Sequence, residues 1–376
     1  LSGSSWANAS GDLQLMINKA CANTEIWVAQ GTYQSSGTGF VLKNDVQVFG
    51  GFSNSGNPIM ENRNPTTYKS ILSGNNIRRV FYNNFSSANP LTSSAVLDGF
   101  TITEGNFGNG AGMYNANASP TLKNLIFLNN NSTGNGGAMY NAASNPLIID
   151  CQFIENTANN GGAISNASIS TPSIVNSLFV ENTAISSGGA IFANNGSSYE
   201  LVNSTIYNNT ANVGGGLNHA GNTTHPTVKN SIIYGNGQQV INNSSATTTI
   251  EYSLVQGGYS GIGNLVGDPL FVNTTSGIYS LQACSPAINS GNNVLIPSGV
   301  TTDIAGNTRT YATTVDMGAY EYQSPKQFAP AITLEPVNFY ACVGSSASFS
   351  ITATNTSIYQ WQVNTGSAFA NVNNNA

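Results

Sequence analysis

Two glutamates stand at equivalent positions of two similar segments, and they are the best candidates for chemistry in the chain. Glu155 lies in the segment 148–156 and Glu181 in the segment 174–182. If these segments stack as neighbouring strands, the two carboxylates come within about 5 Å of each other. That separation is close to the one that retaining glycosidases use, so the pair is compatible with hydrolysis of a glycan.

The sequence around the pair favours a structural origin. Repetition of a segment places a glutamate beside its copy without any catalytic need, and the neighbouring units hold neutral Asn129 and Asn208 at the same position. His219 and His225 are too isolated to indicate a metal site. We therefore predict a non-enzymatic protein with no cofactor and no metal. A polysaccharide lyase or glycoside hydrolase is the alternative.

The elements that must position these residues repeat with a period of 26 or 27. Each unit has a polar residue at the third position of its segment and an asparagine six residues later. The first column is Asn124, Asp150, Asn176, Asn203 and Asn230, and the second is Asn130, Asn156, Asn182, Asn209 and Asn236. Glycine corners such as Gly161-Gly-Ala-Ile164 recur at the same period. A regular internal repeat of this length is typical of a solenoid.

The composition of each unit predicts the kind of solenoid. Short apolar runs are broken by Asn, Gly, Ser and Pro, which indicates strands and turns rather than helices. Three short strands and their turns use about 26 residues, and stacked rungs of this kind form a parallel β-helix. We expect an all-β, right-handed, single-stranded parallel β-helix, because parallel crossover connections favour that hand.

On this fold, residues one period apart stack about 4.8 Å apart. Two large inward columns and one small one follow: Leu122, Ile148, Ile174, Leu201 and Val228; Phe127, Phe153, Phe179, Ile206 and Ile233; and Leu125, Cys151, Ser177, Ser204 and Ser231. At that spacing an amide can donate to the amide of the next rung. Both polar columns are therefore predicted to be structural ladders.

An outward column on the same strands is apolar, and it is the candidate ligand-binding face. It consists of Leu128, Ile154, Val180, Tyr207 and Tyr234. An apolar outer column is either covered by another segment or binds a partner, and the sequence leaves both readings open. Tyr207 and Tyr234 could stack on sugar rings. A shorter column of Thr157, Thr183 and Thr210 is a weaker sign of ice binding.

The ends of the chain differ from the repeat. We predict a β-helix over residues 1–323, with a cap at 1–30, regular rungs at 96–236 and a C-terminal capping region at 264–323. The cap holds one amphipathic helix in 9–20, started by Ser10 or Asp12. In the capping region, Arg309 is expected to be clamped by carboxylates and so to finish the last open rung.

The C-terminal residues have a different pattern. Residues 324–331 are a proline-containing linker. Residues 332–376 alternate in polarity and resemble the opening strands of an immunoglobulin-like sandwich, with Trp361 as its core tryptophan. Because the chain stops before such a sandwich closes, we expect an incomplete immunoglobulin-like domain, which is either completed by residues beyond this chain or disordered.

The charge of the chain limits its partners. Of 376 residues, only 7% are charged, against roughly 25% in ordinary domains, and the formal net charge is −6. This argues against nucleic acid and against anionic membrane surfaces. No apolar run is long enough to insert into a membrane. Without a starting methionine or a signal peptide, the chain is expected to be a segment of a longer protein.

Two motifs resemble known families. Phe153 to Asn156 followed by Gly161-Gly-Ala-Ile164, and its copy one period later, resemble the repeats of polymorphic outer-membrane proteins. The ending from Asp268-Pro-Leu-Phe through Ser285-Pro-Ala-Ile to Asp316-Met-Gly-Ala-Tyr-Glu321 is similar to the choice-of-anchor Q domain of secreted bacterial β-helix proteins. Together they cover most of residues 1–323. The pattern departs from the family where Ile206 and Ile233 replace phenylalanine.

The resemblance implies an extracellular protein that is secreted or held at the cell surface. It implies an adhesin or stalk module whose partner is a glycan or protein on a surface or another cell. Further domains of the same polypeptide would extend the module. Both motifs identify architecture more strongly than activity.

Overall fold

The structure is a computed structural model that describes residues 6–337, 340, 342, 348–356, 358, 360–364, 366 and 368–372. The chain divides into two compact units, Leu1–Ser324 and Pro325–Ala376.

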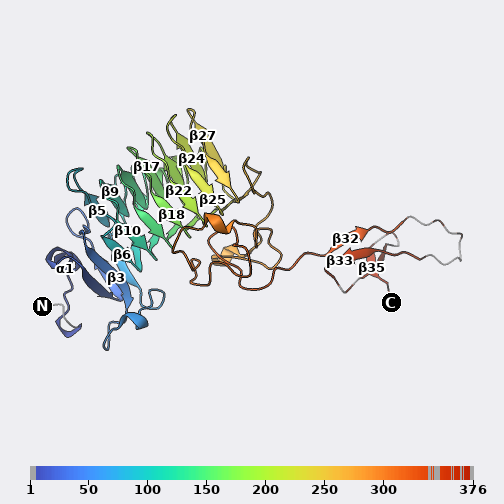
Figure 1. Cartoon of the computed structure of the whole chain (residues 1–376), viewed down its shortest axis with the longest axis horizontal. Helices are drawn as coiled ribbons and strands as arrows, with labels where there is room; N and C mark the ends of the chain where they lie inside the picture. The colour runs from blue at the N-terminus through green and yellow to red at the C-terminus, as the bar shows by residue number, and fades with distance from the viewer. Residues whose placement is uncertain are drawn as a thin grey trace. The chain divides into compact units, whose positions relative to one another are not determined.

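The first unit is an all-β parallel solenoid of about nine turns, of the right-handed type (Figure 1). Sheet A stacks β1 (Thr24–Ala29), β3 (Val46–Phe52), β6 (Val96–Asp98), β10 (Thr121–Lys123), β14 (Leu147–Ile149), β18 (Ser173–Val175), β22 (Glu200–Val202), β25 (Thr227–Lys229) and β28 (Thr249–Glu251). Sheet B stacks β2 (Gly31–Gln34), β4 (Ser70–Ser73), β7 (Phe100–Thr103), β11 (Ile126–Leu128), β15 (Gln152–Ile154), β19 (Leu178–Val180), β23 (Thr205–Tyr207), β26 (Ile232–Tyr234) and β29 (Leu254–Val255).

Two further sheets complete the turns. Sheet C stacks β5 (Phe81–Asn84), β9 (Met113–Ala116), β13 (Met139–Ala142), β17 (Ile164–Ala167), β21 (Ile191–Ala193), β24 (Leu217–Ala220) and β27 (Val240–Asn243). A short sheet D lies between B and C along the chain and stacks β8 (Asn106–Phe107), β12 (Asn131–Ser132), β16 (Thr157–Asn160) and β20 (Thr183–Ser187).

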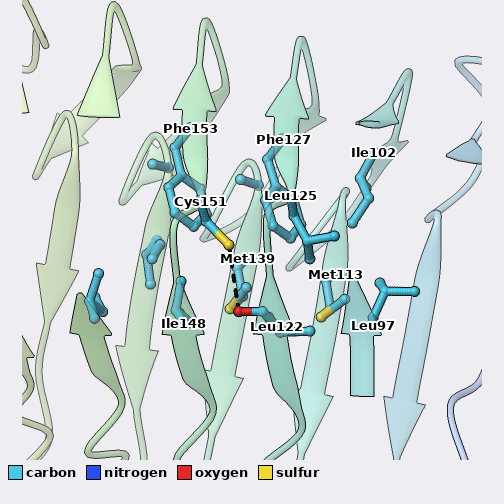
Figure 2. Packing of buried hydrophobic residues seen from close by; sticks show 14 of the residues in the cluster. Leu97, Ile102, Met113, Leu122, Leu125, Phe127, Met139, Ile148, Cys151 and Phe153 are labelled. Atoms are coloured by element: carbon cyan, nitrogen blue, oxygen red, sulfur yellow. Dashed lines mark hydrogen bonds between the residues drawn. The ribbon is translucent and has the colours of Figure 1, made fainter. Parts of the chain in front are cut away.

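In the interior, residues of the same type stack on one another in successive turns. Phe127 pairs in register with Phe153, and Phe153 with Phe179. Their ring centroids lie 5.0 and 4.6 Å apart with planes within 6° of parallel, and all three side chains are fully buried. Figure 2 shows two of these rings with the neighbouring inward columns, including Cys151 and Leu125. The predicted parallel β-solenoid is confirmed.

The corners explain the abundance of asparagine. Asn124, Asn176 and Asn203 have φ of 50°, 48° and 49°, and Asp150 follows them with 54°. This left-handed conformation favours asparagine and aspartate over other side chains that carry a Cβ. The first polar column is therefore also the row of turns that joins sheet A to sheet B.

The N-terminal cap contains a shorter helix than predicted. The α-helix α1 spans Leu13–Lys19, after a 3-10 turn at Trp6–Asn8. Asp12 caps it, because its carboxylate accepts a hydrogen bond from the Leu15 N–H at 2.9 Å. Leu13 and Ile17 are buried in the core. In the portion of the chain that is described, no helix is long and apolar enough to span a membrane.

The region 264–323 does not finish the stack in the way we predicted. Residues 259–265 close the last turn, where Tyr259 packs on the core and Leu265 bridges to Leu254. The following segment, 268–322, folds back along the outside of the coil and carries the hairpin of β30 (Phe271–Asn273) and β31 (Ile278–Leu281). Arg309 contacts Asn176, which lies three turns before the last one. The apolar outer surface of sheet B supplies the reason, since the segment buries it.

The second unit contains two antiparallel pairs of strands. β32 (Ala331–Leu334) pairs with β33 (Thr352–Thr354), and β34 (Gln362–Asn364) pairs with β35 (Phe369–Asn371). Trp361 lies 6.4 Å from Phe349, centroid to centroid. Ala347 and Tyr359, which belong to the predicted strands, lie outside the described residues. The immunoglobulin-like domain stays a prediction.

Candidate functional site

Glu155 and Glu181 occupy corners of the coil. They follow β15 and β19, whose residues pair in register, so the two glutamates hold equivalent places on adjacent turns. Both are exposed, with φ of 54° and 56°, and the neighbouring corners Asn129 and Asn208 have φ of 53° and 54°. Asn208 donates a hydrogen bond to Glu181 at 3.4 Å. The pair is thus part of a row of exposed turn residues.

The predicted ligand-binding column on sheet B is largely occupied by the chain itself. Leu128 and Ile154 are half-buried, whereas Val180 is 1% exposed. Tyr207 packs on Phe271 and Tyr279 of the segment 268–322, with centroids 5.4 and 5.6 Å apart, and Tyr234 belongs to the same cluster. Tyr207 is therefore engaged in an intramolecular aromatic contact.

A buried ion pair joins two residues of the segment 268–322, and its arginine also contacts Asn176 of the solenoid. Arg309, only 1% exposed, donates to Glu321 at 3.1 Å and to the Ala319 carbonyl at 3.2 Å. Glu321 also accepts from the backbone N–H groups of Tyr311 and Asp316, at 2.8 and 2.9 Å. Burial raises the pKa of Glu321 to about 7, Asp316 adds to this rise, and Arg309 opposes it. Among the described residues only the Nε of Arg309 is left without a hydrogen-bond partner in this arrangement, which is a structural clasp.

The two predicted ladders behave differently. Along the second column, Asn130, Asn156, Asn182 and Asn209 each donate to the carbonyl oxygen of the next side chain at 2.9 Å, ending at Asn236. The first column is interrupted, which corrects the prediction of a continuous ladder. Asn124 donates to Asp98 and Asn176 to Asp150, but Asn203 and Asn230 bond instead to backbone groups of Asp316 and Asn292. The folded-back segment takes these amides as partners.

Asp150 is the one carboxylate of the first column, whose other four members are amides, and its ionised form should weaken the fold above about pH 6. Burial raises its pKa to about 6, the Asn176 hydrogen bond opposes the rise, and Asp303 adds to it. Because the pKa is higher in the folded state than the roughly 3.9 of an unfolded chain, stability falls as pH rises from about 4 to about 6. We expect Asp150→Asn to raise the free energy of unfolding by about 1–2 kcal/mol at pH 8.

The gain should vanish near pH 3, roughly one unit below the unfolded pKa, where the wild-type carboxyl is largely protonated in both the folded and the unfolded state. Urea unfolding of the two proteins at both values of pH measures it. An equal gain at both values would mean that the aspartate is not the source of the pH dependence.

An aromatic ladder lies on the outer face of sheet C. Tyr82, Tyr114 and Tyr140 pair in register on β5, β9 and β13. Their ring centroids lie 5.2 and 5.5 Å apart, and all three side chains are half-buried. Burial raises the pKa of Tyr140, and Tyr114 adds to the rise, so its hydroxyl is neutral at physiological pH. Ser165 follows Tyr140 in this column, and the ladder ends there.

Arg79 flanks the aromatic ladder. Its guanidinium carbon lies 4.3 Å from the ring centroid of Phe107 and 5.0 Å from those of Tyr82 and Tyr114. Its Nε donates to the Asn109 carbonyl at 2.8 Å. No carboxylate of the described residues forms an ion pair with it. Burial lowers its pKa, yet an arginine stays charged at neutral pH.

Sequence reasoning missed this ladder, although a signal was present. Each tyrosine follows an inward apolar residue, in Phe81-Tyr82-Asn83, Met113-Tyr114-Asn115 and Met139-Tyr140-Asn141. Strand alternation places that second residue outward. Arg78, which precedes Arg79, donates to the Ser35 carbonyl at 3.2 Å.

The other candidate groups have structural partners. His219 is buried between the Tyr199 hydroxyl at 2.7 Å and the Asn242 amide oxygen at 3.0 Å, and burial lowers its pKa to about 4. The described part of the chain holds no group of three or more His, Cys, Asp or Glu residues that could bind a metal ion.

Comparison with known proteins gives a partial match to one family. The family model of the Chlamydia polymorphic membrane protein repeat matches residues 150–167 and 176–194. No curated protein matches the chain. Among solved structures, the crystal structure of the pectate lyase Pel9A is similar, with 15% identity and a TM-score of 0.44, over 84% of this chain and 92% of that one. This chain is therefore a parallel β-solenoid in which two successive turns are similar to the Chlamydia polymorphic membrane protein repeat.

Proposed function

We propose that the chain is a non-enzymatic module of a surface-exposed protein, an adhesin or stalk that binds its partner with the outer face of sheet C. The observation that carries the proposal is the stack of Tyr82, Tyr114 and Tyr140 with Arg79 beside it. On sheet B, Tyr207 packs against Phe271 and Tyr279 of the segment 268–322. The tyrosines of sheet C remain partly exposed.

Three further features support a binding role over catalysis. The solenoid is a rigid rod of stacked turns, which suits the display of an extended surface. Glu155 and Glu181 are exposed turn residues. The similarity of two turns to a repeat of polymorphic membrane proteins supports a place at the cell surface.

The proposal predicts that Tyr114→Ala combined with Tyr140→Ala weakens binding to glycan arrays or to whole cells by at least about tenfold. Removing two stacked rings takes away contacts worth about 1.5 kcal/mol or more, and about 1.4 kcal/mol corresponds to tenfold in affinity. The matched control is Phe192→Ala, because Phe192 points outward from the same sheet two turns beyond Tyr140. Circular dichroism should show that both variants stay folded.

Unchanged binding by the double tyrosine variant would contradict the proposal. So would an equal loss in the Phe192 variant, because the ladder would then have no special part.

A further inference from the structure

The ring spacing of the ladder on sheet C and the charge of Arg79 indicate which class of molecule binds there. We infer that it binds an extended glycan containing uronic acids, laid along the coil axis, with a sugar carboxylate on Arg79. This inference rests on the proposed function and specifies its ligand class.

The spacing of the rings favours a glycan over a peptide. The ring centroids repeat at 5.2 and 5.5 Å. An extended peptide rises roughly 3.3 Å per residue and roughly 6.7 Å per pair, so its side chains lose register with the ladder within two turns. One pyranose of an extended β-1,4-linked chain is close in length to one ring step. Each tyrosine can therefore meet a successive sugar.

The hydroxyl groups of the ladder are available to such a chain. Within the described residues, the phenol oxygens of Tyr82, Tyr114 and Tyr140 have no hydrogen-bond partner. A phenol both donates and accepts, as sugar hydroxyls do, and a stacked row of rings presents its edges and hydroxyls outward. The surface thus offers a regular row of polar groups on an apolar support.

Arg79 is the reason to expect a preference for sugars that carry a carboxylate. Among the described residues, only the Nε of Arg79 has a protein acceptor, so both Nη groups keep donors for a ligand. The stack of Phe107, Tyr82 and Tyr114 against the guanidinium holds its orientation before a ligand arrives. A planar guanidinium with free Nη groups matches the two oxygens of a carboxylate. Among the described residues Arg79 forms no ion pair with a carboxylate, and its guanidinium lies against three aromatic rings.

Calorimetric titration of the full chain tests the inference with three probes. They are β-1,4-linked uronic acid oligosaccharides, the same oligosaccharides after chemical reduction of their carboxyl groups, and poly-L-glutamate. We expect the acidic oligosaccharides to bind at least about tenfold more tightly than the reduced ones and than polyglutamate. Arg79→Gln should bring the acidic and reduced forms to equal affinity. Arg78→Gln, which removes the adjacent arginine, should leave the preference unchanged.

The outcomes separate the inference from the proposed function. If acidic and reduced oligosaccharides bind equally, and Tyr114→Ala with Tyr140→Ala weakens both, the acidic ligand is wrong and the proposed face stands. If polyglutamate binds as tightly as the uronic acids, the partner is an acidic protein. If no oligosaccharide binds, the inference fails. If the tyrosine variant binds uronic acids as well as the wild type does, both ideas fail.

Discussion

Glu321→Ala is expected to lower the free energy of opening of the segment 268–322 by about 3–5 kcal/mol. The substitution leaves Arg309, 1% exposed, as a buried charge with no carboxylate bound to it. It also removes the acceptor for the backbone N–H groups of Tyr311 and Asp316. Because the segment packs on the solenoid from outside, it should open locally while the stacked turns remain folded.

Hydrogen exchange and limited proteolysis of 268–322 measure the loss. The control is Glu200→Ala, which breaks an ion pair of Glu200 with Lys229 at 2.6 Å whose side chains are 44% and 24% exposed. An exposed pair of this kind contributes under about 1 kcal/mol. If the two variants lose the same stability, the burial of the clasp has no special effect.

The regular turns could be predicted because residues one sequence period apart are in physical contact. Residues 26 apart, such as Phe127 and Phe153, touch directly, so each column of the repeat reports on its own packing. The second asparagine column could be predicted for the same reason, because its buried members repeat the same side-chain hydrogen bond.

The folded-back segment could not be placed from the sequence for the opposite reason. Some of its contacts with the solenoid join residues more than a hundred positions apart, such as Asn176 and Arg309. Unlike the contacts of the regular turns, they are not repeated along the sequence. Arginine with carboxylates suits the end of a coil as well as its side, and the pattern does not distinguish the two. The apolar column of sheet B likewise allowed either covering or binding, until Phe271 and Tyr279 were seen against Tyr207.

Asn182→Ala should lower the free energy of unfolding of the solenoid by about 3–5 kcal/mol. Asn182 is fully buried, and its amide donates to the Phe153 carbonyl at 2.8 Å and to Asn209 at 2.9 Å. Its oxygen accepts from both the backbone N–H and the side chain of Asn156, at 3.0 and 2.9 Å. Alanine leaves these buried groups without partners, and each such loss costs about 1–3 kcal/mol. Urea unfolding followed by circular dichroism gives the difference.

Two further variants show whether the ladder itself is responsible. Asn208→Gly keeps the positive φ of 54° at an exposed corner and should change stability by less than about 1 kcal/mol. Asn182→Asp keeps the acceptor but, when ionised, cannot donate to the Phe153 carbonyl. Burial should raise the pKa of this aspartate above the unfolded value of roughly 3.9, so its stability should be highest below about pH 4 and fall as pH rises. A loss that is the same at every pH would contradict this expectation, because only ionisation of the aspartate removes the donor and adds a buried charge.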